Sequence, residues 1–274
     1  MSENESKSFL SSLKEAVLPR TENTEGSTPM ALPDDAPVEI SAEVQELLER
    51  GAHFGHKKSK LHPSMLPFIT GVRNTVHIID VQKTWEMMQR AAQFLQDQAA
   101  LGKTVLFVGT KPSMRTIVQE HAVKCGVPYV VERWAGGTLT NWKTISLRID
   151  HLRELEAKKA SPDWEKYTKQ ERSLMDQEIA RLTLQWGGIR DMKRLPDAVV
   201  IVDATHDETA MREAHVLKIP IVGLVNTDTK ISDIAFPIPA NDNSRKTAEY
   251  ILQHLQESIV KGKSTVIEKP REHS

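Results

Sequence analysis

A short segment near residue 55 gathers residue types that bind phosphate groups. Two glycines and two histidines lie between Gly51 and His56, and the cations Lys57, Lys58 and Lys60 follow directly. Glycine lets a backbone approach a phosphate closely, and each lysine neutralises negative charge. A solvated basic loop with packed histidines is the plain alternative. The histidines lack the His-Glu-x-x-His or cysteine partners of a metal site. We therefore expect the three lysines to contact phosphate groups, with no bound metal.

A second group of polar residues lies in the segment Gly71–Val76. Here Arg73 and Asn74 precede an apolar stretch, so the sequence predicts a turn just before a strand. Asparagine is common in turns for conformational reasons alone. Arginine beside it suits a phosphate or a base edge, because its planar guanidinium offers several donors. We expect Arg73 and Asn74 to be candidates for contact with a phosphate or a base edge.

A third group spans the segment from Arg133 to Lys143, which reads Arg-Trp-Ala-Gly-Gly-Thr-Leu-Thr-Asn-Trp-Lys. Arginine and lysine at its two ends can bind a nucleic-acid backbone, and the faces of Trp134 and Trp142 can stack on bases. The two tryptophans can equally anchor the helices that follow, and the two roles are compatible. We expect Arg133 and Lys143 to complete this set of candidate nucleic-acid contacts.

Two strand-to-helix turns leave an enzymatic alternative open. The turn at Gly109–Lys111 could hold a phosphate at a helix N-terminus, and Asp203 with His206 could act as acid and base. Neither a Gly-x-x-x-x-Gly-Lys-Ser/Thr motif nor a Gly-x-Gly-x-x-Gly motif is present. The acidic residues near 205 are explained more simply as helix caps. A phosphate- or nucleotide-handling enzyme is therefore the weaker hypothesis.

Short apolar stretches alternate with helical patterns over most of the chain, and these elements must position the groups above. Strands alternating with helices indicate a parallel sheet covered on both faces, and the right-handed crossover rule indicates a doubly wound α/β fold. The predicted strands are Val76–Asp80, Thr104–Gly109, Val127–Val131, Ala198–Asp203, Ile221–Val225 and a short edge strand Phe236–Ile238.

Residues 142–186 interrupt this alternation with two helical stripes. A polar break at Ser161-Pro162-Asp163 separates the stripes, and Thr168 with Glu171 forms a capping box at the start of the second. We expect an antiparallel helical hairpin that projects from the sheet and is charged over most of its surface. The apolar positions are Ile145, Ile149, Leu152 and Leu155, then Met175, Ile179, Leu182 and Trp186.

Composition and charge limit the class of protein. The 274 residues are 39% hydrophobic and 27% charged with one cysteine, so we expect a cytosolic globular protein without disulfides or a membrane partner. Residues 1–46 carry a net charge of −7 and the remainder +6. We predict a disordered acidic extension (1–40), an α/β domain (41–141 and 187–262), the hairpin (142–186) and a flexible tail (263–274).

Taken together, these segments resemble the family of bacterial small-subunit ribosomal protein two. The resemblance covers about Val44 to Val260, and the order and spacing of its four segments make it specific. Departures occur at Ala135, where the family commonly has leucine, and at Asn226–Ile231, which puts the turn there in doubt. The four segments are Leu47–His56, Phe68–Asp80, Phe107–Lys111 with Arg133–Lys143, and Gly187–Ala198.

The resemblance implies a flavodoxin-like sheet with an inserted coiled-coil hairpin. It implies a structural role in the cytoplasmic small ribosomal subunit, with binding to small-subunit ribosomal RNA at the head–body junction. Its implied protein partners are ribosomal protein one, which such proteins help to recruit, and neighbouring small-subunit proteins. It implies neither catalytic activity nor a cofactor. A protein adaptor that uses the hairpin without RNA is the remaining alternative.

Overall fold

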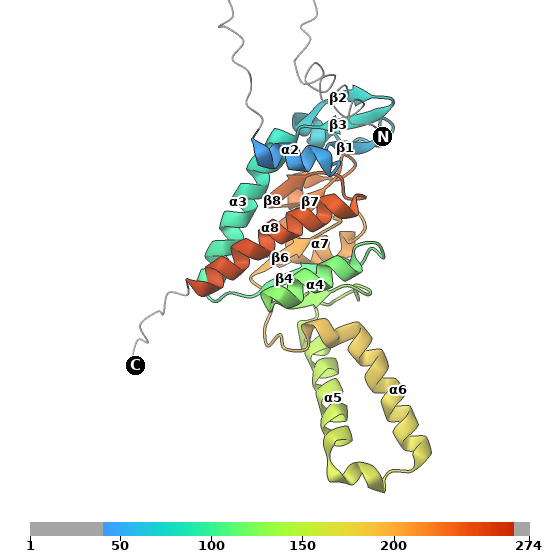
Figure 1. The fold of residues 1–274 in the computed structure, drawn as a ribbon. Coiled ribbons are helices and arrows are strands. Elements are labelled where there is room, and N and C mark those ends of the chain that lie inside the picture. The colour runs from blue at the N-terminus through green and yellow to red at the C-terminus, as the bar shows by residue number, and fades with distance from the viewer. Residues whose placement is uncertain (1–40, 266–274) are drawn as a thin grey trace, which may run out of the picture.

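A five-stranded parallel sheet forms the centre of the protein (Figure 1). The computed structural model describes residues 41–265. The strand order β5-β4-β6-β7-β8 is that of a flavodoxin-like arrangement, so the predicted α/β class with a parallel sheet is confirmed. The strands are β4 (Val105–Val108), β5 (Tyr129–Val130), β6 (Ala198–Ile201), β7 (Ile221–Val225) and β8 (Phe236–Pro239).

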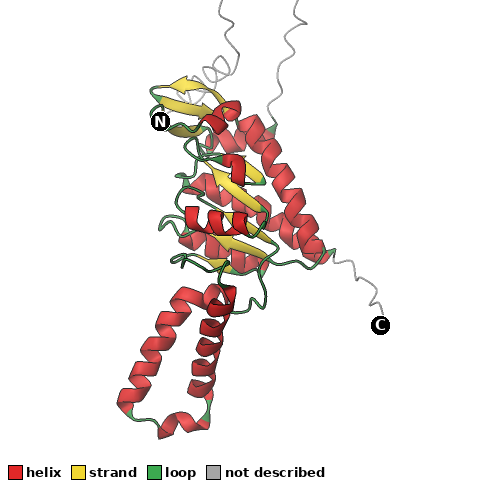
Figure 2. Ribbon diagram, turned by 180° about the vertical axis from the view of Figure 1, so that it is seen from behind, coloured by secondary structure: helices red, strands yellow, loops and turns green. Residues whose placement is uncertain are grey.

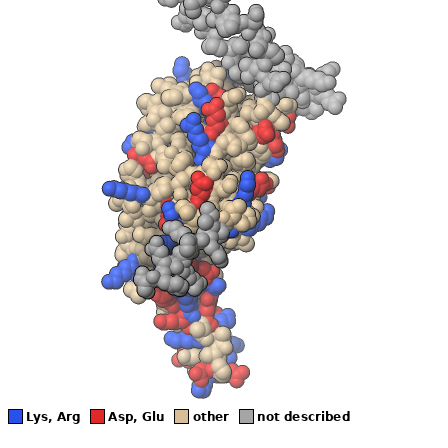
Figure 3. Space-filling model, turned by 90° about the vertical axis from the view of Figure 1, so that its left-hand side faces the viewer, with Lys and Arg blue, Asp and Glu red and all other residues tan. Residues whose placement is uncertain are grey.

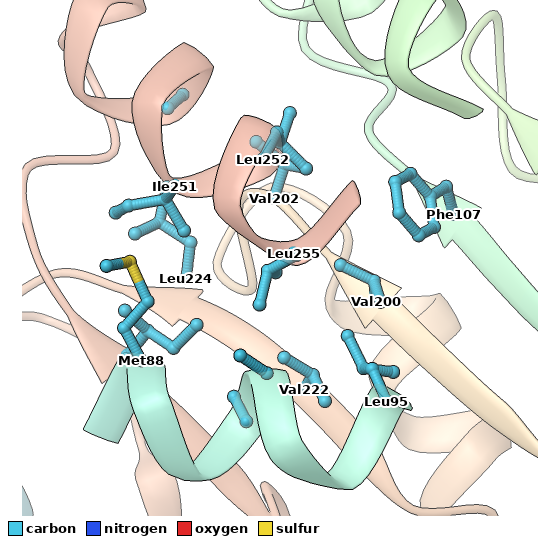
Figure 4. Packing of buried hydrophobic residues seen from close by; sticks show 14 of the residues in the cluster. Met88, Leu95, Phe107, Val200, Val202, Val222, Leu224, Ile251, Leu252 and Leu255 are labelled. Atoms are coloured by element: carbon cyan, nitrogen blue, oxygen red, sulfur yellow. The ribbon is translucent and has the colours of Figure 1, made fainter. Parts of the chain in front are cut away.

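Alternate residues of the strands pack against helices on one face of the sheet, as the two-residue period of a strand requires. Val105 and Phe107 of β4, with Val200 of β6, belong to this layer (Figure 4). Leu252 and Leu255 bring the last helix onto the same residues. The helices of this layer are α2 (Ala42–Glu49), α3 (Val81–Ala100), α4 (Arg115–Cys125) and α8 (Arg245–Ser264).

The intervening residues face the opposite layer. Leu106 and Val108 pack there with helix α7 (Glu208–Val216) and with the base of the helical hairpin. All four residues of β4 are buried, which explains why this strand reads as a continuous apolar run. Because apolar residues cover both faces of the sheet, polar side chains gather in the loops that follow the strands.

The predicted hairpin projects from one end of the sheet (Figures 1 and 2). It consists of α5 (Trp142–Ala160), the short 3-10 helix η2 (Pro162–Lys166) and α6 (Lys169–Trp186). The capping box of Thr168 and Glu171 is confirmed, with both reciprocal hydrogen bonds present. Positive and negative side chains are interspersed on its surface (Figure 3). Coiled-coil packing of α5 on α6 stays a prediction.

A second, three-stranded antiparallel sheet corrects one expectation. Val76–Asp80 was expected in the parallel core, but this stretch forms β3 (Val76–Ile79) between β1 (Phe54–Lys57) and β2 (Ile69–Arg73). The reason is the connection, because two residues between β2 and β3 suffice for a hairpin and not for a parallel crossover. Strand β1 was missed because Phe-Gly-His-Lys carries no β-branched residue.

Element ends differ modestly from expectation. Helix α4 begins at Arg115 rather than near Pro112, and α8 continues to Ser264. The predicted acidic extension (1–40) and residues 266–274 of the predicted C-terminal tail lie outside the described residues, whereas Lys263 and Ser264 belong to α8. No helix within residues 41–265 is long and apolar enough to span a membrane.

Candidate nucleic-acid interface

The small antiparallel sheet brings together the five residues predicted from the first two segments. Lys57 on β1 and Arg73 on β2 are both register partners of Val76 on the middle strand. Directly opposed residues point to the same face of a sheet, so the two cations flank Val76 on one face. All five side chains are exposed. We call this group the sheet-tip cluster: Lys57, Lys58, Lys60, Arg73 and Asn74.

A two-residue turn shapes the cluster. Asn74 and Thr75 have φ angles of 47° and 68°, so both occupy the left-handed region that a type I′ hairpin turn requires. Asparagine tolerates this conformation, whereas a β-branched threonine adopts it at an energetic cost. The backbone nitrogen of Lys58 donates to the carbonyl of Thr75 at 2.8 Å, which ties the lysine loop to the turn.

The loop after β7 holds the small sheet against the α/β domain. The hydroxyl of Thr227 accepts a hydrogen bond from the backbone of His56 at 2.9 Å, and its carbonyl accepts from the backbone of His62 at 2.8 Å. A Cβ atom on Gly55 would lie 2.6 Å from the Thr227 methyl group, so only glycine fits there. Thr227 thus positions the sheet-tip cluster, a role that neither apolar periodicity nor charge around this residue indicates.

The segment from Arg133 to Lys143 is organised around a buried carboxylate. Glu213 of α7 accepts hydrogen bonds from the indole nitrogen of Trp134 at 3.0 Å and from the backbone of Gly137 at 2.7 Å. Its second oxygen accepts from the backbone of Leu139 at 2.9 Å and from the backbone and hydroxyl of Thr140 at 3.1 and 3.2 Å. Trp134 is buried, so its interpretation as an anchor is confirmed.

The electrostatics of Glu213 follow from these donors. Burial pushes the pKa of this carboxyl up, but the bonds from Trp134 and three backbone amides outweigh burial and lower the pKa. Sequence reasoning missed this residue. A signal existed, because Glu213 lies on the same face of α7 as the buried Ala210 and Ala214, where an acidic residue needs a partner.

Arg133 and Lys143 are exposed at the two ends of this loop, and we call them the hairpin-base pair. Lys143 lies in the first turn of α5, where the hairpin leaves the domain. The small sheet and the hairpin lie at opposite ends of the molecule (Figure 1). The predicted residues therefore form two separate groups on either side of the α/β domain, not one patch.

The turn that suggested a nucleotide site is occupied by the protein itself. The amine of Lys111 contacts a carboxylate oxygen of Asp203 at 2.8 Å and the side-chain oxygen of Asn243 at 2.9 Å. Of Thr205 and Asp207, the two candidates for the N-cap of α7, Asp207 occupies that position. Its side chain makes no capping bond, because it accepts from the backbone and hydroxyl of Thr110 at 3.1 and 2.6 Å. Burial raises the pKa of Asp207 despite these bonds. The carboxylates of Asp203 and Asp207 thus already accept the hydrogen bonds that Lys111 and Thr110 could otherwise donate to a phosphate.

The two histidines of the first segment and the acidic residues Asp191 and Asp203 lie in different environments. His53 is buried against the ring of Phe54, and burial together with the charge of Arg73 lowers its pKa. The side chain of Asp191 is 92% exposed, while Asp203 is paired with a lysine. His56 lies 3.4 Å from Asp228 instead. Within residues 41–265, no group of three or more His, Cys, Asp or Glu side chains is arranged to hold a metal.

Comparison with known proteins gives one consistent result. The family model described as ribosomal protein S2 matches residues 47–262. A Thermus thermophilus relative is 44% identical over 232 residues, which are 85% of this chain and 90% of the relative. Relatives from Thermosynechococcus vestitus and Rhodopirellula baltica are 42% and 41% identical, over 82% and 80% of this chain and 86% and 85% of theirs. All three bear the name small ribosomal subunit protein uS2. The chain belongs to the ribosomal protein S2 family.

Proposed function

We propose that this protein is a structural component of the small ribosomal subunit that binds small-subunit ribosomal RNA through the sheet-tip cluster and the hairpin-base pair. The observation that carries the RNA contact is the state of the three lysines. Lys57, Lys58 and Lys60 are exposed, and their amines make no ion pair or hydrogen bond with any residue from 41 to 265. Exposed lysines without partners among the described residues are suited to RNA phosphates.

The role is structural rather than catalytic, because the matched family consists of structural ribosomal proteins. The ion pair of Lys111 supports the same conclusion, since its amine is already paired with Asp203. Two finer features belong to the proposal: a position at the head–body junction, and recruitment of ribosomal protein one with contacts to neighbouring small-subunit proteins. The projecting hairpin provides charged surface for such neighbours.

The first test is incorporation into subunits. A tagged copy with Lys57→Glu and Lys58→Glu should comigrate less with small subunits in a sucrose gradient than the unaltered chain, because two phosphate contacts become repulsive. Lys103→Glu with Lys124→Glu is the matched control. Both control lysines are exposed and precede strands β4 and β5, at the opposite edge of the sheet from the loops described above. Equal incorporation of the two variants at physiological salt would refute the sheet-tip assignment.

A further inference from the structure

The acidic charge preceding the described residues is unevenly distributed. Residues 1–40 lie outside the span matched to the family, which begins at residue 47. Residues 1–20 contain three acidic and three basic side chains and are neutral, whereas residues 21–40 contain five acidic side chains and no basic one. The acidic residues of this second half are Glu22, Glu25, Asp34, Asp35 and Glu39.

The surface with the matching charge belongs to the sheet-tip cluster. Lys57, Lys58 and Lys60 occupy three of four consecutive positions, from the last residue of β1 into the turn that follows, and have no partner among residues 41–265. Apolar surface adjoins them, since Phe54 at the start of β1 is 43% exposed. Residues 21–40 also contain apolar side chains, including Leu32 and Val38. Both charge and apolar character are therefore complementary.

The chain is long enough to make this contact. Residue 41 precedes α2, whose eight residues span about 12 Å, and the four residues of β1 span about 13 Å. An extended chain reaches about 3.3 Å per residue, so the seven residues from Asp34 to Ser41 cover about 23 Å. Asp34 therefore lies near the limit of reach and Glu25 well within it. Because both partners belong to one chain, their effective concentration is in the millimolar range.

We propose that residues 21–40 bind the sheet-tip lysines of the same chain when the protein is free, and that RNA must displace them. The acidic segment then shields a basic surface from unrelated polyanions until a phosphate array of higher charge density replaces it. Docking itself does not depend on the proposed function; only its displacement by ribosomal RNA does. The attraction is electrostatic and exposed to solvent, so salt should weaken it.

Zero-length carbodiimide cross-linking of the full chain tests docking directly. At low salt, we expect carboxylates of residues 21–40 to couple to Lys57, Lys58 or Lys60 far more often than to the exposed Lys103 and Lys124, and the preference should disappear at high salt. A mixture of ¹⁴N- and ¹⁵N-labelled protein separates contacts within one chain from contacts between two copies. Cross-links spread evenly over the lysines, or formed only between differently labelled chains, would overturn the proposal.

Affinity for a heparin fragment tests the shielding. The variant Glu25→Gln, Asp34→Asn, Asp35→Asn should bind heparin more tightly. If the lysines are covered about four-fifths of the time, the dissociation constant should fall about fivefold. The control Glu3→Gln, Glu5→Gln, Glu15→Gln changes net charge equally within the same forty residues and should leave affinity nearly unchanged. Equal effects of the two variants, or no effect of either, would refute shielding by residues 21–40.

These measurements separate the inference from the proposed function. If the lysines do not contact ribosomal RNA, charge reversal at Lys57 and Lys58 leaves subunit incorporation intact, while cross-linking and heparin binding still report docking. If the acidic segment does not dock, the cross-links are absent, yet incorporation remains sensitive to the lysines. The RNA contact of the lysines and the docking of residues 21–40 can therefore be refuted separately.

Discussion

Buried carboxylates in this protein divide according to the hydrogen bonds they receive. Asp207 and Asp242 are buried, and in each case burial dominates and raises the pKa. Glu213 is also buried, but the indole of Trp134 and three backbone amides of the same loop lower its pKa. Its carboxylate therefore stabilises the folded protein in the ionised form and holds the hairpin base to α7.

Replacing Glu213 by glutamine should destabilise the protein. A carboxylate accepts at both oxygens, whereas the amide nitrogen of glutamine would face either the donors at Trp134 and Gly137 or those at Leu139 and Thr140. We expect a loss of about 1–3 kcal/mol in the free energy of unfolding, measured by urea denaturation. Glu208→Gln on the exposed face of the same helix is the control. A loss no larger than that of the control would contradict the anchoring role.

The pH dependence of stability should report the same carboxylate. The folded-state pKa of Glu213 is lowered, so its contribution is fully present above the unfolded pKa of about 4.3. The contribution is lost as pH falls through the folded pKa. The difference in unfolding free energy between the unaltered protein and Glu213→Gln should therefore be constant near neutrality and shrink below about pH 4. Asp207 and Asp242 titrate in both proteins and cancel. A difference that grows on acidification would reverse the sign and exclude this account.

At the scale of elements, close contact between α3 and α8 depends on a single small residue. Gly262 of α8 is buried, and a Cβ there would overlap the backbone oxygen of Gln96 and lie 2.9 Å from the Cβ of Ala99. These are backbone or near-backbone atoms, so a rotamer change cannot relieve the overlap. The two helices must separate or bend to accept a side chain.

Gly262→Ala should therefore lower the melting temperature, although alanine favours helices. The expected steric cost is about 1–3 kcal/mol, which exceeds the gain of about 1 kcal/mol in helix propensity. Gly71→Ala provides the control, because a Cβ there meets nothing within 4 Å. Thermal unfolding followed by circular dichroism measures both. An increase in melting temperature for Gly262→Ala would show that the two helices adjust freely.

Elements with strong periodicity were predictable from sequence, and those built from long-range contacts were not. Strand β4 is recognisable as the continuous apolar run Val105–Val108, and α3 is recognisable by apolar residues at helical spacing. Strand β1 has no such pattern, because its conformation depends on pairing with β3 and on bonds to Thr227. The class of fold therefore followed from the sequence, but the second sheet did not.

The same distinction holds for the candidate site. Exposed cations such as Lys57 and Arg73 could be selected by residue type and spacing, because a lysine or arginine carries its positive charge whatever its neighbours are. Their division into two groups could not be foreseen, because it depends on where the small sheet and the hairpin attach. Glu213 and Thr227 were missed because they act on other residues over separations of more than seventy positions.

At the scale of the whole molecule, the α/β domain separates two candidate contact regions. The sheet-tip cluster lies on the small sheet and the hairpin-base pair at the start of α5, at the other end of the domain (Figure 1). A single nucleotide or short peptide cannot bridge both regions. A large folded RNA can contact both, and its recognition would then depend on shape more than on base sequence.

Two distant regions that bind one RNA should contribute independently. Neutralising Lys57 and Lys58 to glutamine should reduce the slope of log affinity against log salt by roughly two. Neutralising Arg133 and Lys143 to glutamine should do the same. Because the regions are far apart and share no side chain, the free-energy losses of the combined variant should add to within about 0.5 kcal/mol. Filter binding of purified protein to small-subunit ribosomal RNA over a salt series measures slopes and affinities together.

A variant whose slope equals that of the unaltered protein would show that its region does not contact the RNA. A combined loss much smaller than the sum would mean that the two regions serve alternative binding modes, since only contacts made at the same time contribute additively to one complex.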